Sequence, residues 1–289
     1  MESNQLEFKM MGKGSLPALH YAFEQSFGDY QVSVANDLEA LKYRLNKIGA
    51  NLDLSPAIWQ DEAVLAFIIQ ALGNYKGLKT AYNGGTGVLP TFRGRGLAVK
   101  LYRFAFEKLK EQQVKQCLLE VVENNEPALK AYRQLGFEVS RTMHCYLGEP
   151  SKNLKGNKSI QLLPVKDRLP DWQLYRSFFD FEPCWQNSID SVIRNFQNET
   201  IIEAVYRTKT VGFVIFEPLK SRVTQLAVHP EHRVMGIGIQ LLRAASQMCL
   251  KKELAILNID VQAKATNRFL HRCGMVKKVT QFEMLRPLF

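Results

Sequence analysis

The sequence predicts an α/β protein of two tandem domains, each a mixed sheet flanked by helices. Three observations favour this fold class. A length of 289 residues suits about two domains. Strand-like and helix-like segments alternate along both halves, which indicates sheets covered by helices on both faces. A glycine-rich segment that begins near residue 85 recurs about 140 residues later.

The repeat joins residues at matching positions of the two halves. The matching pairs, 140 or 138 residues apart, are Pro90 with Pro230, Arg93 with Arg233, Gly96 with Gly236, and Gly136 with Gly274. Units of this length are domains and not the short repeats of a solenoid. Between them, 148–158 (GEPSKNLKGNK) has the polar composition of a linker. We therefore expect domains at 1–147 and 159–289.

The first half predicts two helices, then strands and helices in alternation. The expected elements are helices at 15–28 and 36–48, a strand at 63–72 after a hairpin turn at Asp61–Glu62, a strand before Pro90, a helix from about 94 to 114, a strand at 116–122 and a short helix at 126–135. The second half repeats this order. Its expected elements are strands at 201–207, 211–217 and 222–228, a helix from 236, a strand at 254–261 and a helix at 265–273.

Composition excludes several classes of protein. Hydrophobic residues make up 46% and charged residues 23%, as in ordinary globular proteins. No apolar run approaches the ~18 residues of a membrane span, and the N-terminus lacks the apolar core of a signal peptide. Five scattered cysteines without CxxC spacing predict reduced, mostly buried thiols in a cytoplasmic protein. The five histidines show no metal-ligand spacing, so we expect no metal.

Net charge is +10 and is uneven: residues 1–145 carry +2 (17 Lys and Arg against 15 Asp and Glu), and residues 146–289 carry +8 (21 against 13). This surplus favours an anionic partner, such as a phosphorylated cofactor, nucleic acid or an acidic protein, with plain solubility as the alternative. Nucleic acid is disfavoured because we find neither a basic recognition helix nor an RNA-binding motif with interleaved aromatic and basic residues.

The repeated segments RGRGLA and RVMGIG both fit R-x-x-G-x-(G/A) after a strand and at the start of a helix. The second helix has apolar residues at 237, 241, 244 and 248, the spacing of one helix face. Unpaired N–H groups, glycines that allow close approach and the helix dipole favour a pyrophosphate there, and the arginine adds a cation. A Walker A loop is excluded by the missing GKS/T, and the place after the middle strands argues against a dinucleotide fingerprint.

The longer pattern V-x-P-x-x-R-x-x-G-x-(G/A) resembles the acetyl-CoA motif of the GCN5-related N-acetyltransferase (GNAT) superfamily, here in a tandem two-domain member. The resemblance covers most of each half and implies a mostly antiparallel, splayed sheet. It also implies that strand residues Val88 and Val228 face the pantetheine arm. By the same resemblance, the two pyrophosphate loops consist of Arg93, Gly94, Arg95, Gly96, Leu97 and Ala98, and of Arg233, Val234, Met235, Gly236, Ile237 and Gly238.

The segment 119–137 (LEVVENNEPALKAYRQLGF) is similar to ribosomal-protein alanine N-acetyltransferases. That likeness implies that Glu120 is the general base, Asn125 contacts pantetheine and Tyr132 protonates the leaving thiolate. The residues agree, because Glu120 is the only charge in CLLEVV and Tyr132 shares a helix face with apolar neighbours. A hydrogen-bonded carboxylate at a strand end and a core tyrosine bound to water are the structural alternatives.

The second half departs from this pattern. The matching positions hold Asn258 for the glutamate, Ala263 for the asparagine and Leu270 for the tyrosine, with Asn267 one turn further on. Asparagine and leucine cannot replace the base and the acid. Asp260, two residues further along the same strand face, is the remaining candidate base. We therefore expect catalysis in the first half alone.

The resemblance implies an N-acetyltransferase that moves an acetyl group from acetyl-CoA, its cosubstrate, directly to a primary amine of a small molecule or peptide. The Val88 N–H would stabilise the oxyanion, and no cysteine relay is expected because Cys117 faces away from Glu120. Candidate acceptor contacts are Tyr82, Asn83 and Trp59, with 27–33 as a further wall. The alternative is a CoA-binding regulatory or scaffold protein without turnover. We expect a monomer or homodimer and no membrane partner.

Overall fold

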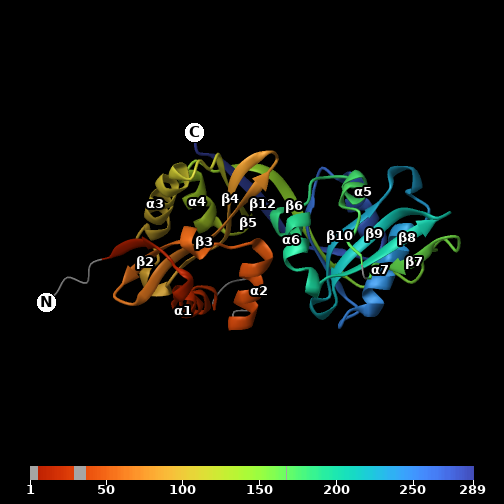
Figure 1. Cartoon of the computed structure of the whole chain (residues 1–289), viewed down its shortest axis with the longest axis horizontal. Helices are drawn as coiled ribbons and strands as arrows, with labels where there is room; N and C mark the ends of the chain where they lie inside the picture. Colours follow the sequence, from red (N-terminus) through yellow and green to blue (C-terminus); the bar gives the residue numbers. More distant parts are fainter. Residues whose placement is uncertain (1–5, 29–36, 167) are drawn as a thin grey trace. The chain divides into compact units, whose positions relative to one another are not determined.

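The computed structural model describes residues 6–28, 37–166 and 168–289. The chain divides into two compact units, one of residues up to Ser140 together with Phe282–Phe289, and one of Arg141–Gln281 (Figure 1). Each unit holds an open sheet with helices on both of its faces, as the sequence predicts. No helix in these described ranges has the length and hydropathy that a membrane span requires.

The first unit contains a sheet in the order β1-β2-β3-β4-β5, antiparallel except for the parallel pair β4–β5. Its elements in chain order are β1 (Glu7–Met10), α1 (Leu16–Phe27), α2 (Leu38–Ile48), β2 (Pro56–Gln60), β3 (Ala63–Tyr75), β4 (Leu78–Val88), α3 (Leu97–Glu111), β5 (Gln116–Val122) and α4 (Glu126–Gln134). Strand β6 (Glu138–Gly148) leads from this unit into the second.

The second unit repeats this plan, with β7-β8-β9-β10-β11 in sheet order, a parallel pair β10–β11, and β6 antiparallel to β11. Its elements are β7 (Gln161–Pro164), α5 (Trp172–Ser177), α6 (Ile189–Arg194), β8 (Thr200–Tyr206), β9 (Lys209–Glu217), β10 (Arg222–Val228), α7 (Ile237–Met248), β11 (Leu254–Asp260) and α8 (Lys264–Arg272). Strand β12 (Val276–Pro287) ends in the first unit.

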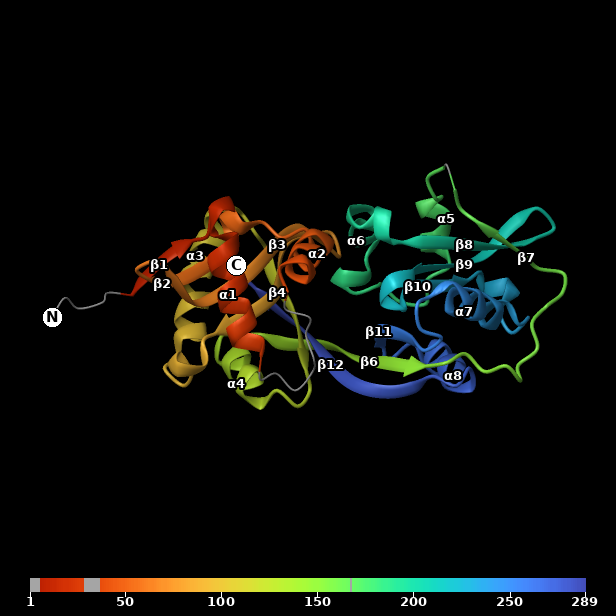
Figure 2. The same cartoon turned by 90° about the horizontal axis from the view of Figure 1, so that it is seen from below.

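Alternation along the strands gives each sheet two buried faces. In β3, Ala66 and Ile68 face the core formed with α3 and α4, whereas Phe67 stacks on Phe23 of α1. The second unit separates its helices in the same way: α7 and α8 cover one face, and the segment around α5 and α6 covers the other (Figure 2). The strands are therefore apolar on both sides, as the sequence pattern indicates.

The division of the chain differs from the one predicted at the end of the sequence. The last eight residues belong to the first unit, where Met284 and Leu288 are buried in the core with α3 and β5. The buried Glu283 accepts hydrogen bonds from Tyr75 (3.0 and 2.9 Å) and Ser140 (2.9 Å). No local sequence signal reports this pairing, because strand partners are chosen by contacts distant in the chain.

The predicted linker is an ordered segment packed on the second unit. Arg243 of α7 donates through Nε to the Ser151 carbonyl (3.0 Å) and through Nη2 to the Leu154 carbonyl (2.7 Å). Gln240 pairs with both backbone groups of Asn157. Polar composition therefore marks a segment without regular structure here, and side chains of α7 hold it in place.

Local predictions agree with the elements to within a few residues. Strands β5 and β10 begin and end at the expected residues. Helices α3 and α7 begin later than expected, because a 3₁₀ turn and two residues in the left-handed region precede each of them. Met248, placed on the apolar face by its spacing, is the last residue of α7 and is 52% exposed. All five cysteines are buried thiols.

Candidate functional site

The sheet of each unit splays open at the same place. Strands β4 and β5 pair only from Thr80–Gln116 to Asn83–Leu119, so the last five residues of β4 leave their neighbour. Strands β10 and β11 separate after Val223–Ile256, again five residues before β10 ends. The backbone groups on this side of β4 and β10 therefore face a gap.

Hydrogen bonds at the strand ends orient one N–H into each gap. The Leu89 N–H donates to the Leu65 carbonyl of β3 (2.9 Å), and the His229 N–H donates to the Val211 carbonyl of β9 (2.9 Å). Since successive N–H groups of a strand point to opposite sides, the N–H groups of Val88 and Val228 point away from β3 and β9 and into the gaps. This is the orientation that the predicted oxyanion contact of Val88 requires.

A glycine-rich loop joins the splayed strand to the next helix in both units. In the first, Gly94 and Gly96 have φ of 76° and 69°, and α3 begins at Leu97, followed by Ala98. In the second, Val234 and Gly236 have φ of 64° and 78° before α7. These left-handed positions turn the chain so that the helix N-terminus faces the ligand side of the loop.

The loop arginine is held by protein groups in both units, which differs from the expected role as a cation for the ligand. Arg93 donates to the carbonyls of Val88 (3.3 Å) and Ser26 (3.0 Å). Arg233 donates to the carbonyls of Val228 (3.1 Å) and Phe178 (3.2 Å), and its Nη1 lies 2.6 Å from Asp180. The arginine therefore ties the loop to its own strand and to the preceding helical segment.

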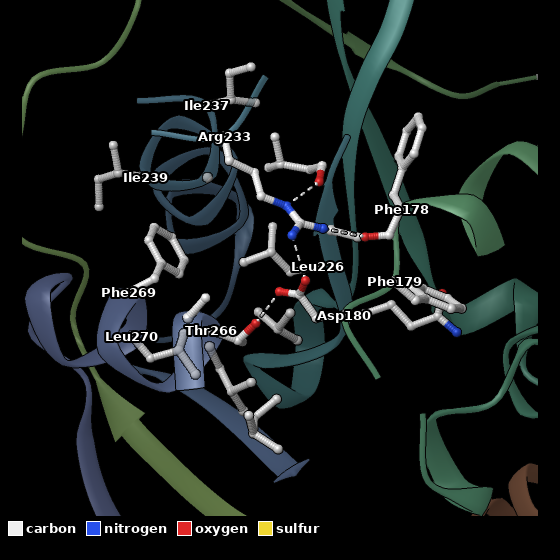
Figure 3. Close-up of a pocket in the computed structure, with 18 of the residues that line it drawn as sticks. Phe178, Phe179, Asp180, Leu226, Arg233, Ile237, Ile239, Thr266, Phe269 and Leu270 are labelled. Atoms are coloured by element: carbon white, nitrogen blue, oxygen red, sulfur yellow. Dashed lines mark hydrogen bonds and ion pairs between the residues drawn. The ribbon is translucent and has the colours of Figure 1, made fainter. Parts of the chain in front are cut away.

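Asp180 joins two sides of the second-unit site (Figure 3). Besides Arg233, it accepts a hydrogen bond from the Thr266 hydroxyl of α8 (2.7 Å). Sequence reasoning missed Asp180, because nothing local links it to residues 53 and 86 positions away. Arg95 in the first unit has a different environment, over the Phe92 ring and bonded to the Thr91 carbonyl (3.2 Å).

The two glycine loops differ in how much of the chain covers them. A Cβ on Gly236 would lie 2.7 Å from the Lys155 carbonyl oxygen and 3.2 Å from Gly156 Cα, and one on Gly238 would lie 2.7 Å from the Phe269 ring. For Gly94 and Gly96 no described atom beyond their own chain neighbours lies within 4 Å of that point. Among the described residues, nothing covers the first loop, whereas residues 155–156 and Phe269 lie close to Gly236 and Gly238 of the second loop, which also lines a pocket.

A pocket of about 570 Å³ lies in the second unit, along the gap between β10 and β11 (Figure 3). Its lining is largely apolar and includes Leu226, Phe178, Phe179, Phe269 and Leu270. This cavity lies in the unit that lacks the expected acid. A pocket without a proton donor can hold a ligand, but it lacks the group that would assist departure of a thiolate.

The expected catalytic pair of the first unit lies on β5, which borders the gap, and on α4, the helix that follows β5. Glu120 is half-buried near the end of β5, and Tyr132 on α4 is 8% exposed. The Tyr132 ring meets those of Tyr102 and Phe137 edge-on, with centroids 5.9 and 5.8 Å away. Asn125 caps α4, accepting from the Ala128 N–H (3.2 Å).

The matching positions of the second unit have structural environments. Asn258 lies at φ 61° in a bulge of β11, donates to Cys184 Sγ (3.3 Å) and accepts from the Cys145 thiol (3.4 Å). Leu270 is buried in the core beside α7. Asp260, the alternative base, lies 3.7 Å from Arg141 and accepts from the Gln262 N–H (2.8 Å).

Two further second-unit positions behave in the same way. Ala263 precedes α8 without a side-chain cap, and Asn267 accepts a hydrogen bond from the Tyr146 hydroxyl (2.6 Å) while donating to the Asp260 carbonyl (2.8 Å).

Cys117 of the first unit is buried, and burial raises the pKa of its thiol to about 12. It is therefore a neutral thiol at physiological pH, in line with the expectation of no covalent relay.

The residues expected to contact the acceptor lie in the core of the first unit. Tyr82 is 1% and Trp59 8% exposed, and Trp59 stands on β2, two strands removed from β4. The Asn83 amide is bonded to Thr86 and Tyr102. Burial of these side chains gives the expectation no support, and most of 27–33 lies outside the described residues.

Tyr102 was not singled out from the sequence, although it touches Tyr132 and Asn83. The signal was available in the repeat, because the residue 140 positions later on the matching helix is Leu242. A tyrosine on an apolar helix face, at a position where the other domain has a leucine, indicates a buried hydroxyl with a hydrogen-bond partner.

Comparisons with known proteins agree with this geometry. In Saccharomyces cerevisiae, N-alpha-acetyltransferase 30 is 35% identical over 88 residues, which are 30% of this chain and 47% of that protein, so the chain spans about half the length of this relative. Two solved structures share the fold. A GCN5-related N-acetyltransferase from Sphaerobacter thermophilus has a TM-score of 0.73 at 15% identity, covering 100% of this chain and 97% of its own. A tandem GNAT protein from the clavulanic acid biosynthesis pathway has a TM-score of 0.71 at 14% identity, covering 99% of both chains.

A family model provides the decisive comparison. The model of the acetyltransferase (GNAT) family matches residues 19–137 and again residues 169–275, which together make up more than half of the chain. The two matches coincide with the two splayed sheets and their glycine loops. The chain therefore belongs to the GNAT family of acetyltransferases, with two domains of that family in tandem.

Proposed function

We propose that this protein is an acetyl-CoA-dependent N-acetyltransferase whose reaction takes place in the first domain. One observation carries the proposal: Glu120 lies near the end of β5, the strand that parts from β4 at the gap, and Tyr132 lies on α4, the helix that follows β5. The second domain has Asn258 and Leu270 at these positions. The domain with both chemical groups also has an exposed glycine loop that can receive the cofactor.

The first glycine loop fits the pyrophosphate of acetyl-CoA. Gly94 and Gly96 are exposed, and the N-terminus of α3 directs its backbone N–H groups outward. The two arginines of this loop have different roles. Arg93 holds the loop in place through its hydrogen bonds to backbone carbonyls, whereas the Arg95 side chain is exposed. Acetyl-CoA would supply the activated acetyl group as a thioester, and the splayed β4 backbone would receive its pantetheine arm.

Each residue then has one task. Glu120 accepts a proton from the ammonium group of the acceptor, which frees the nitrogen lone pair to attack the thioester carbonyl carbon. The Val88 N–H donates to the oxygen on which negative charge develops. When the carbon–sulfur bond breaks, Tyr132 donates its proton to the departing thiolate. The nitrogen gives its second proton to water as the amide forms, so the amide, CoA thiol, protonated Glu120, Tyr132 phenolate and one hydronium ion balance the reaction, and solvent restores both side chains.

The acceptor is proposed to be a primary amine, with a peptide α-amine as the first class to test. The 119–137 segment resembles ribosomal-protein alanine N-acetyltransferases, and the yeast relative is named an N-alpha-acetyltransferase. Amines of small molecules are the comparison class. Both classes present an ammonium group that a carboxylate such as Glu120 can deprotonate.

The test measures thiol release from acetyl-CoA with peptides of varied N-terminal residue and with small amines. Glu120→Gln and Tyr132→Phe are each expected to lower kcat by about 100-fold or more, the usual contribution of a general acid or base. Leu270→Met, at the position matching Tyr132, is the control and should leave kcat unchanged. Wild-type kcat in both first-domain variants would contradict the assignment.

The pocket of the second domain favours a second candidate function, the binding of a ligand without turnover. Its volume of about 570 Å³ and apolar lining suit a ligand with apolar surface. Calorimetry with CoA and acetyl-CoA distinguishes the two. If no acceptor is acetylated and Leu226→Trp, which narrows this pocket, abolishes binding, then the second domain is the ligand site and the protein a binding module.

A further inference from the structure

A buried chain of polar groups leads to Tyr132 in the first domain. Asn83 Nδ2 lies 2.5 Å from the Tyr102 hydroxyl and 2.9 Å from Thr86 Oγ1, and the two hydroxyls lie 3.4 Å apart. Tyr102 is 1% exposed on α3, and its ring meets that of Tyr132 at 84° with centroids 5.9 Å apart. The chain thus connects the splayed end of β4 to the expected acid.

The direction of these hydrogen bonds follows from the donors available. The Gly85 N–H, which can only donate, lies 2.9 Å from Asn83 Oδ1. The other end of the amide, Nδ2, therefore faces the hydroxyls and donates to the Tyr102 oxygen. Tyr102 accepts this hydrogen bond and keeps its own proton to donate, and the groups beside its hydroxyl are Thr86 Oγ1 at 3.4 Å and the Tyr132 side chain, with which it forms a hydrogen bond.

The surroundings of the Tyr102 hydroxyl agree with a Tyr102 that stays protonated. Burial raises the pKa of Tyr102 well above its ordinary value, and the charge of an ionised Tyr132 and a hydrogen bond with it raise it further, against a lowering by Thr86. The raised pKa keeps the Tyr102 proton in place at physiological pH. A neutral phenol that donates to a phenolate stabilises that phenolate.

The second domain shows that the fold does not need this chain. Its matching residues are all aliphatic, and Val223, Leu242 and Leu270 are buried together in its core, with Leu226 packed against them. The third ring of the aromatic cluster, Phe137, is matched by Met275. Buried polar groups cost free energy unless they are satisfied. Because only the domain with Tyr132 contains these buried polar groups, we connect them with the function of Tyr132 and not with the stability of the fold.

We propose that Tyr102, oriented by Asn83 and Thr86, is a positioning residue for Tyr132, which rests on the proposed function of Tyr132 as the acid. Tyr102 donates a hydrogen bond to the Tyr132 oxygen. When the O–H bond of Tyr132 breaks and the S–H bond of CoA forms, the negative charge left on that oxygen is stabilised by the Tyr102 hydroxyl. The proton of Tyr102 stays in place throughout, and Tyr132 is reprotonated by water.

The experiment compares kcat against pH for wild type, Tyr102→Phe, Tyr132→Phe and the double variant. Tyr102→Phe should lower kcat by about 10- to 100-fold, the range for a hydrogen bond to a charged group, with little change in KM for acetyl-CoA. The alkaline limb of its kcat profile should move to higher pH, because Tyr132 becomes harder to ionise. In the Tyr132→Phe background the same substitution should have little further effect.

The variant Phe137→Leu distinguishes an effect of altered packing from an effect of losing the Tyr102 hydroxyl, because it changes the same ring cluster without removing a hydroxyl. It should lower the melting temperature and leave the alkaline limb in place. A Tyr102→Phe variant with reduced kcat but an unmoved limb, and an effect that multiplies with Tyr132→Phe, would overturn the proposal in favour of a packing role. An unimpaired Tyr132→Phe enzyme would instead overturn the acid assignment itself.

A second readout needs no acceptor. The phenolate absorbance of wild type minus that of Tyr132→Phe, recorded against pH, isolates the ionisation of Tyr132. The same difference between Tyr102→Phe and the double variant should move to higher pH. If the two differences titrate together, Tyr102 donates no hydrogen bond that matters to Tyr132, and the proposal is wrong whether or not an acceptor is known.

Discussion

Two methionines nine residues apart near the C-terminus test which core each part of the chain supports. Met284 is fully buried and packs in the core of the first unit, whereas Met275, 1% exposed, packs in the core of the second. Truncating a buried methionine to alanine costs about 2–5 kcal/mol. Since neither side chain retains appreciable exposure, we expect about 3 kcal/mol at each site.

The assay is hydrogen exchange of the native protein, followed in peptides from α3 and α7. A loss of about 3 kcal/mol corresponds to roughly 100-fold faster exchange through unfolding of that unit. Met284→Ala should accelerate exchange in α3 and leave α7 nearly unchanged, and Met275→Ala should do the reverse. Each variant serves as the control of the other.

Two results would refute this reasoning. Faster exchange in α7 and not in α3 upon Met284→Ala would mean that the last residues stabilise the second unit, as the division predicted from sequence implies. Equal acceleration of both helices by both variants would mean that the chain has one cooperative core. Either outcome contradicts the separation of Met284 and Met275 into different cores.

Three further predictions follow from the described contacts. Gly94→Asp and Val234→Asp place a carboxylate at matching, exposed, left-handed positions of the two loops. Calorimetry should find acetyl-CoA binding weakened about tenfold by Gly94→Asp alone, and an equal effect of both variants would contradict cofactor binding at the first loop. The pKa of Cys117 is raised to about 12, so the contribution of this neutral thiol to the free energy of unfolding is complete below pH 9 and is lost as the pH rises towards 12. Between about pH 8 and 10.5, urea unfolding of wild type should therefore lose about 2 kcal/mol more than that of Cys117→Ala; identical pH dependence would show that this thiol does not contribute. Asp180→Asn keeps a partner for Thr266 but removes the charge opposite Arg233, and because both side chains are about a third exposed it should cost about 1 kcal/mol of second-unit stability; an unchanged urea midpoint would show that the ion pair is immaterial.

The elements predicted best were those with local causes. The apolar run of β3, the strand β5 and the glycine-rich start of α3 are encoded within a few neighbouring residues, and each formed close to its expected bounds. The family motif at Glu120 and Tyr132 was readable for the same reason. The helix α3 begins three residues after the expected start at Gly94, because Gly94 and Gly96 are left-handed and belong to the loop.

The acceptor side is the part of the site that local sequence patterns encode least. Tyr82, Asn83 and Trp59 were chosen for their chemical character near the expected active strand, but burial decides whether such a side chain can meet a substrate. Burial depends on which helices cover a strand, which a strand's own residues do not encode. The Asn83 amide is turned towards Tyr102, a residue of α3 that lies 19 positions away.

The sequence by itself determined that this protein has two similar domains, a glycine-rich helix start in each, and a glutamate–tyrosine pair in the first domain only. All of these are patterns of neighbouring residues or of a fixed offset along the chain. Only the tertiary structure decided that residues 282–289 complete the first unit, that the loop arginines are engaged by protein groups, and that Tyr102 stands behind Tyr132. These depend on contacts between segments distant in sequence, which form only when sheets and helices pack together.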